Sequence, residues 1–126
     1  MERKRSLCII KKDFQTLPED VRNGICGIFT DEPQISRKTA PWSLIIEKEY
    51  QAAYQEELQP RLIELFYETG NWKRTRVRYY RLCTQLFRKN YIEQIGSWCQ
   101  THGWKLIGHH FGEESFSSQL YSNGNN

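Results

Sequence analysis

Two short, continuous apolar runs, each followed at once by polar and charged residues, constrain the fold more than any other feature. The first run spans residues 24–30 and ends at Asp31-Glu32-Pro33. The second spans residues 104–109 and is followed by His110-Phe111-Gly112-Glu113-Glu114. Runs of this kind are typical of strands buried on both faces, as parallel strands are, whereas a one-sided strand alternates. The sequence therefore predicts two parallel strands.

The segment between these runs has helical periodicity. After Pro41-Trp42, Ser43 can cap the free amides of a first helical turn. Apolar residues then keep to one helical face, at Ile46, Tyr50, Ala53, Tyr54 and Leu58. Pro60 cannot continue that helix but suits the first turn of a new one, so we expect two helices with a break near residue 59.

A longer helix is predicted over residues 75–102. Apolar residues recur at threes and fours, at Tyr80, Cys83, Phe87, Tyr91, Ile95 and Trp98, and Gly103 stands where a left-handed cap is needed. The order strand, helices, strand predicts a right-handed crossover between parallel strands, whose functional groups collect at their carboxyl ends. The acidic residues after both strands would then lie at one edge.

Length and composition set the domain organisation. The chain has 126 residues and a formal charge of +3, which fits one domain. We expect an irregular lead-in over 1–23, a folded segment over 24–118 and a disordered tail over 119–126. No signal-peptide core and no membrane-spanning stretch is found, so the sequence predicts a cytoplasmic protein without a membrane partner. Four widely spaced cysteines without a C-x-x-C pair predict buried free thiols.

The residues that follow the strands are the candidate site. Two carboxylates brought across a cleft are what glycoside hydrolysis requires, one as proton donor and one as base or nucleophile. Asp31 and Glu32 are consecutive, so in continued strand geometry they point to opposite faces, and Glu113 and Glu114 pose the same choice. The histidines at 109 and 110 could orient a carboxylate, bind a sugar hydroxyl or help ligate a metal. Solvated turns and a structural histidine pair are the plainer alternatives.

Several motifs in matched order narrow this choice. They are Gly-Ile-Phe-Thr-Asp-Glu-Pro (27–33), Pro41-Trp42-Ser43, Arg78-Tyr79-Tyr80-Arg81 with Leu86-Phe87, Trp98-Cys99, His102-Gly103, and Gly108-His109 with Glu113-Glu114. Over residues 20–118 the chain resembles the central barrel of large bacterial glycoside hydrolases of the α-L-rhamnosidase type. It departs from the family at Tyr54-Gln55-Glu56, where a glycine is usual.

The resemblance implies a fold, a site and a cofactor. The implied fold class is α/β and helix-rich, with two parallel strand–helix units of an incomplete (β/α)8 barrel. Implied catalytic residues are Glu32, Glu113 and Glu114, and implied sugar-binding residues are Asp31, Trp42, His109 and His110. Some members hold a calcium ion. Because a whole barrel takes about 250 residues, we expect the chain to be inactive alone and to need the rest of a split barrel as partner.

A different class of function stays open. The predicted helix over 72–89 combines seven basic residues with aromatic ones, at Trp72, Tyr79 and Tyr80. Basic and aromatic side chains together can hold phosphates and stack on bases. A small nucleic-acid-binding module is therefore the alternative. The low net charge and the need for aromatic residues on the inner face of the helix make it less favoured than the glycoside hydrolase. Steep loss of binding with salt would distinguish it from sugar binding.

Overall fold

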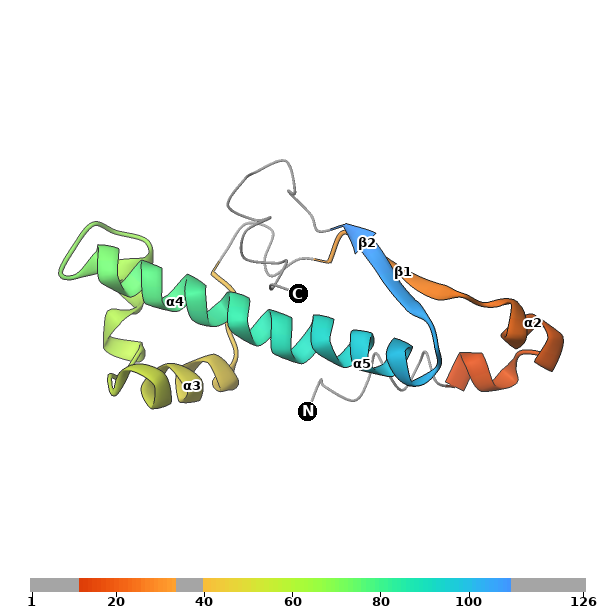
Figure 1. Cartoon of the computed structure of the whole chain (residues 1–126). Helices are drawn as coiled ribbons and strands as arrows, with labels where there is room; N and C mark the ends of the chain where they lie inside the picture. Colours follow the sequence, from red (N-terminus) through yellow and green to blue (C-terminus); the bar gives the residue numbers. More distant parts are fainter. Residues whose placement is uncertain (1–11, 34–39, 110–126) are drawn as a thin grey trace. The chain divides into compact units, whose positions relative to one another are not determined.

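The two predicted strands form and lie side by side (Figure 1). In the computed structural model, which describes residues 12–33 and 40–109, β1 (Gly27–Asp31) pairs in parallel with β2 (Lys105–His109). The register sets Ile28 opposite Leu106 and Phe29 opposite Ile107. A two-stranded parallel sheet within a helix-rich chain confirms the α/β class.

One face of this sheet is covered by a helix and the other is open. Ile28 and Leu106 pack against Ile95, Trp98 and Cys99 of helix α5 (Glu93–Thr101). The register pair on the opposite face, Phe29 and Ile107, stays 62% and 58% exposed. Side chains alternate between the two faces of a strand, so this difference follows from the position of α5 alone.

The lead-in differs from the irregular segment expected over residues 1–23. Residues 12–16 are helical, and helix α2 (Glu19–Gly24) follows. Two acidic residues in the first turn of α2 favour its start, since carboxylates stabilise a helix amino terminus. Phe14 packs edge-on against the rings of Trp98 and Trp104, 6.1 and 4.7 Å away. Segments this short carry no periodicity, so the tertiary contacts of Phe14 had no signal in the sequence.

Residues 40–87 have a core of their own, which divides the segment predicted over 24–118 into two compact units. Helix α3 (Leu44–Tyr54), the 3₁₀ helix η2 (Gln59–Leu65) and helix α4 (Trp72–Phe87) enclose it. Its fully buried members are Tyr50, Leu58 and Tyr79. The core of this unit and the core beneath the sheet share no residue.

The ends of α3 follow from two local interactions. The Ser43 side chain accepts a hydrogen bond from the amide of Ile46, which confirms the predicted cap. Gln55 ends the helix in the left-handed region at φ 54. Pro60 begins η2, so the predicted break occurs, but the second element is a 3₁₀ helix.

The long helix predicted over residues 75–102 is three elements. A turn of π-helix, η3 (Arg88–Ile92), follows α4 and precedes α5. Within α4 the buried tyrosine is Tyr79, and Tyr80 is 49% exposed, so the expected stripe is wrong by one residue there. The rest of the stripe holds on both sides of the π turn, since Cys83 of α4 and Ile95 and Trp98 of α5 are buried. Gly103 takes the predicted left-handed conformation at φ 68.

Some predictions concern residues that the structure does not describe. Residues 1–11 of the predicted lead-in and the predicted tail over 119–126 lie outside the described ranges. Within the helices of residues 12–33 and 40–109, none combines the length and the apolar character that crossing a membrane demands.

Replacing Gly108 by alanine should destabilise the strand pair. The added Cβ would overlap the Thr30 carbonyl, and Gly108 lies at φ +150, which side chains rarely adopt. We expect a loss of about 2 kcal/mol or more and faster amide exchange at Ile28 and Leu106. The matched control is Gly24→Ala, where a Cβ meets nothing within 4 Å. Equal amide protection in both variants would contradict the register.

The cysteines should differ sharply in reactivity. Burial raises the pKa of Cys83 to about 11, and Cys83 and Cys99 are 4% and 1% exposed, whereas Cys26 is exposed. The predicted burial is therefore confirmed for Cys83 and Cys99 and wrong for Cys26. In site-resolved mass spectrometry, iodoacetamide at about pH 8 should alkylate Cys26 rapidly and the two buried thiols only after denaturation. Equal labelling of Cys26 and Cys83 in the native chain would contradict the core.

Because the pKa of Cys83 is raised in the folded chain, the neutral thiol contributes fully to the free energy of unfolding at neutral pH. This contribution is lost as the pH rises toward about 11.

Candidate active site

The carboxyl ends of β1 and β2 bring two carboxylates to one imidazole. The last residue of β1, Asp31, is the register partner of the last residue of β2, His109. The His109 Nε2 atom lies 3.4 Å from Asp31 Oδ1 and 3.8 Å from Glu32 Oε1. A protonated imidazole would form an ion pair with both carboxylates, and a neutral one could donate through Nε2 to either. The predicted meeting of strand-end polar residues at one edge is confirmed for these three.

Glu32 is turned toward His109 by an unusual backbone. The strand ends at Asp31, and Glu32 takes φ 43, in the left-handed region that non-glycine residues seldom occupy. Opposite faces were expected only for continued strand geometry, and that condition does not hold, because the strand ends before Glu32. Such conformations cost about 1–3 kcal/mol and concentrate at functional sites. This backbone is a second feature that distinguishes the strand end from an ordinary solvated turn.

The three side chains lie on the face that α5 leaves open. Asp31 follows Phe29 by two residues and His109 follows Ile107 by two, so all four belong to one face. The rings of Phe29 and His109 are 5.8 Å apart and nearly edge-on. An exposed apolar surface thus adjoins an exposed group of two carboxylates and an imidazole. This combination can hold a hydroxyl-bearing ring by contact on one side and by hydrogen bonds on the other.

The remaining predicted site residues are Trp42, which belongs to the other compact unit, and three residues outside the described ranges. Trp42 belongs to the unit of residues 40–87, where it is 47% exposed. The predicted residues His110, Glu113 and Glu114 lie outside the described residues. The structure therefore places one of the two acidic clusters.

The described residues do not fit a calcium site. No group of three or more His, Cys, Asp or Glu within 12–33 and 40–109 is arranged to hold a metal ion. Calcium takes six to eight oxygen ligands, and the described strand ends offer only the carboxylates of Asp31 and Glu32 at this edge. Calcium binding stays a prediction from resemblance, and no chemistry is derived through it.

Four side chains in the two cores have raised pKa values. Burial raises the pKa of Tyr50, Tyr79, Cys83 and Cys99, and each of these side chains is buried. A raised pKa keeps phenol and thiol neutral near pH 7, so these groups are poor nucleophiles. The candidate chemistry therefore belongs to Asp31, Glu32 and His109.

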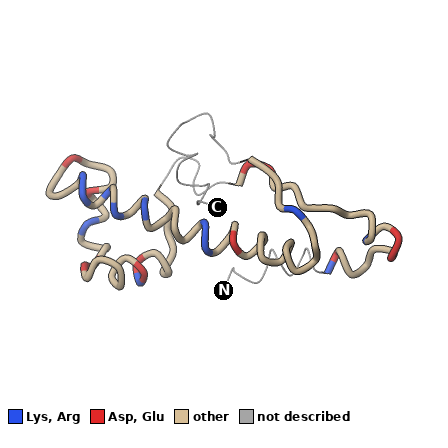
Figure 2. Tube along the Cα trace, in the orientation of Figure 1, with Lys and Arg blue, Asp and Glu red and all other residues tan. Residues whose placement is uncertain are grey.

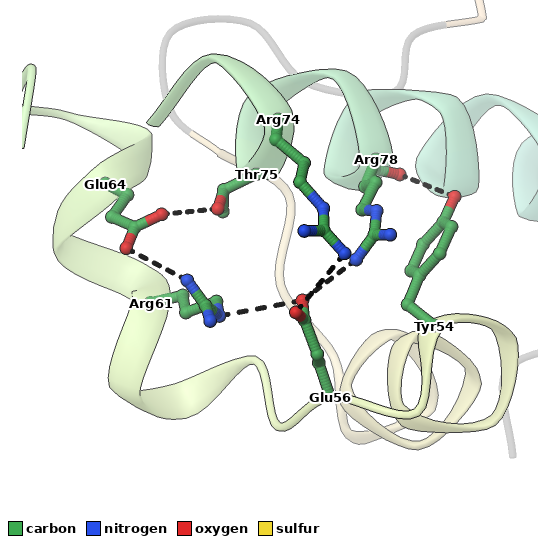
Figure 3. A network of polar contacts seen from close by, with 7 residues as sticks. All are labelled: Tyr54, Glu56, Arg61, Glu64, Arg74, Thr75 and Arg78. Atoms are coloured by element: carbon green, nitrogen blue, oxygen red, sulfur yellow. Dashed lines mark hydrogen bonds and ion pairs between the residues drawn. The ribbon is translucent and has the colours of Figure 1, made fainter. Parts of the chain in front are cut away.

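Basic residues line α4 (Figure 2), and several contact acidic residues of the preceding segment (Figure 3). The Glu56 carboxylate forms ion pairs with the guanidinium groups of three arginines, Arg78 at 2.9 Å, Arg74 at 3.5 Å and Arg61 at 3.6 Å. The buried Glu64 accepts hydrogen bonds from the Thr75 hydroxyl and from Arg61, the latter at 3.2 Å. No sequence pattern indicated this network, because its partners are up to 22 residues apart.

These contacts favour a structural role for the basic helix. Tyr79 is fully buried, and its hydroxyl donates to the carbonyl of Pro41, so it has no face free for a base. The cationic groups of Lys73 and Arg76 lie 5.2 and 4.6 Å from the centre of the Trp72 ring. Two of the aromatic residues behind the nucleic-acid alternative, Trp72 and Tyr79, therefore make contacts within this unit.

Comparison with protein-family models, with curated proteins and with solved structures finds no match for this chain. The functional conclusion therefore depends on the parallel strands and on the residues at their carboxyl ends.

Replacing Glu56 by glutamine should weaken the unit of residues 40–87. Three guanidinium groups lose their shared carboxylate, and partly exposed ion pairs of this kind contribute about 0.5–1 kcal/mol. Chemical denaturation should show this loss at low salt and a smaller one at high salt, since salt screens the pairs. Its exposed neighbour provides the control variant Glu57→Gln, which should change little. Equal effects of the two variants would contradict the network.

Proposed function

We propose that the chain is part of a glycoside hydrolase of the α-L-rhamnosidase type, in which β1 and β2 are neighbouring strands of a (β/α)8 barrel. The observation that carries the proposal is the parallel register that sets Asp31 opposite His109, with Glu32 beside them. In barrels of this class, catalytic residues come from the carboxyl ends of several strands. The site has the position and the groups that this chemistry needs.

The two faces of the sheet support the same proposal. A barrel strand has a helix against its outer face and side chains of other strands against its inner face. α5 covers one face here, and the exposed pair Phe29 and Ile107 marks the other. Asp31 and His109 share that open face. They would therefore point toward the inside of the barrel, where the sugar is bound above the packed layers.

Each residue then has a role. Glu32 is the acid or base, and its counterpart is Glu113 or Glu114. Asp31 and His109 bind sugar hydroxyls, and His109 also orients the carboxylates that it contacts. Trp42 and His110 are further sugar-binding residues in this proposal. Inversion or retention depends on the separation of the two catalytic carboxylates, about 6.5–9.5 Å or about 5 Å respectively.

Sugar binding by the full chain tests the proposal. Methyl α-L-rhamnopyranoside should shift the amide NMR signals of Asp31, Glu32 and His109, and methyl α-D-glucopyranoside should shift them less. Glu32→Gln should weaken the response at least about fivefold, equivalent to about 1 kcal/mol. Asp20→Asn, an exposed carboxylate of α2, is the matched control. Absent shifts, or equal shifts with both sugars, would sink the proposed specificity.

The incomplete barrel gives a separate expectation. The chain alone should not hydrolyse aryl α-L-rhamnosides, because six strands of the barrel would be contributed by another polypeptide segment. Turnover should appear when that segment is supplied and be lost with Glu32→Gln. Turnover by the chain alone would contradict the need for a partner.

A further inference from the structure

The arginine cluster of residues 40–87 carries more positive charge than its own carboxylates balance. Arg61, Arg74 and Arg78 converge on the Glu56 carboxylate (Figure 3). A fourth arginine lies beside them, because Arg76 Nε donates to the backbone carbonyl of Glu64, whose carboxylate pairs with Arg61. In the part of the chain that the structure describes, no ion pair joins these arginines to any other acid. Four guanidinium groups therefore share two carboxylates.

Two of the converging arginines are held by contacts other than those with Glu56. The Arg78 guanidinium lies 4.7 Å from the centre of the Tyr54 ring, and the Tyr54 hydroxyl donates to the Arg78 carbonyl at 3.2 Å. Arg61 donates to Glu64 Oε1 at 3.2 Å. Groups that are held in place before a ligand arrives lose less conformational freedom on binding. Arg61 and Arg78 therefore form a preorganised pair of cations.

Glu56 leaves many of the guanidinium donors unused. Only Arg78 reaches its carboxylate at 2.9 Å, the usual distance of a charge-assisted hydrogen bond. Arg74 and Arg61 lie farther away, at 3.5 and 3.6 Å. The Arg74 side chain is 56% exposed, and those of Arg61 and Arg78 are 30% and 24% exposed. An anion from solvent can therefore reach all three.

The position of Glu56 allows its carboxylate to be exchanged for another anion. Glu56 lies in the short link between α3 and η2, after the left-handed Gln55, and belongs to neither helix. Turning its side chain toward solvent breaks no backbone hydrogen bond of a helix. Its carboxylate thus occupies the place that an external anion would take.

We propose that Arg61, Arg74 and Arg78 bind a phosphate dianion, as inorganic phosphate or a phosphomonoester, in exchange for the Glu56 carboxylate. Such a group carries a charge of about −1.5 to −2 at pH 7 and presents oxygens that match the fork of a guanidinium. It matches the positive charge that Glu56 and Glu64 leave unbalanced, whereas a second carboxylate would only replace the first. The site does not depend on the proposed role of the strand-end carboxylates.

Titration of the full chain with inorganic phosphate at low salt tests the site. The Nε–H NMR signals of Arg74 and Arg78 should shift saturably, and Arg74→Ala should weaken binding at least about fivefold. The matched control is Arg81→Ala, which removes an equal charge from an exposed position of α4 that forms no ion pair within residues 12–33 and 40–109. An equal loss in both variants would reveal general attraction to a basic surface and overturn the proposal.

The Glu56→Gln variant should respond in the opposite direction. Removing the competing carboxylate should strengthen phosphate binding at least about fivefold. Phosphate should also restore the stability that this variant loses, because a ligand of the folded state stabilises it. Glu57→Gln, its exposed neighbour, should change neither quantity. A network with only a structural role would show the loss of stability without any effect of phosphate, and that result would overturn the proposal.

Three further probes identify the kind of phosphate. Methyl phosphate that binds as well as inorganic phosphate assigns the site to phosphomonoesters, and methyl phosphate that binds more weakly assigns it to the free ion. Dimethyl phosphate carries a single charge, like each phosphodiester of a nucleic acid, and should bind more weakly than either. Tighter binding of dimethyl phosphate or of a short oligonucleotide would overturn the proposal in favour of a nucleic-acid interface.

Discussion

Parallel hydrogen bonding between β1 and β2 is the constraint on which the rest of this unit depends. It joins residues far apart in the sequence in one register and so sets Asp31 opposite His109. A parallel pair needs a long crossover, and its last elements supply α5, which buries Ile28 and Leu106. The same bonds align the amino ends of both strands. A shift of one residue would reverse the side chains of one strand and separate Asp31 from His109.

The sequence predicted what local chemistry decides. Continuous apolar runs located both strands, Ser43 located the start of α3, and Gly103 located a left-handed cap. It could not predict what depends on distant contacts. The short helices near the amino terminus depend on the packing of Phe14 against Trp98 and Trp104, and no period reveals that.

The candidate site, like the fold, was predicted in part from the sequence. Which residues meet at the strand ends followed from the parallel order, because carboxyl ends of such strands share an edge. How Glu32 turns did not follow, since the sequence does not reveal that strand geometry stops one residue earlier. The choice of Tyr79 over Tyr80 for the core was missed because both tyrosines fit a spacing of three or four residues to the buried Cys83, and only tertiary packing decides between them.

The asymmetry of the sheet connects stability with function. Phe29 and Ile107 are held in register on an exposed face, and each exposed Å² of apolar surface forgoes about 25 cal/mol of burial. A chain selected only for its own stability would carry polar residues on that exposed face, so that apolar and polar residues alternate along each strand. Apolar residues there, ending in two carboxylates and a histidine, are instead what the inner surface of a closed barrel requires. In the proposed barrel, this exposed face would orient Asp31 and His109 toward a bound sugar.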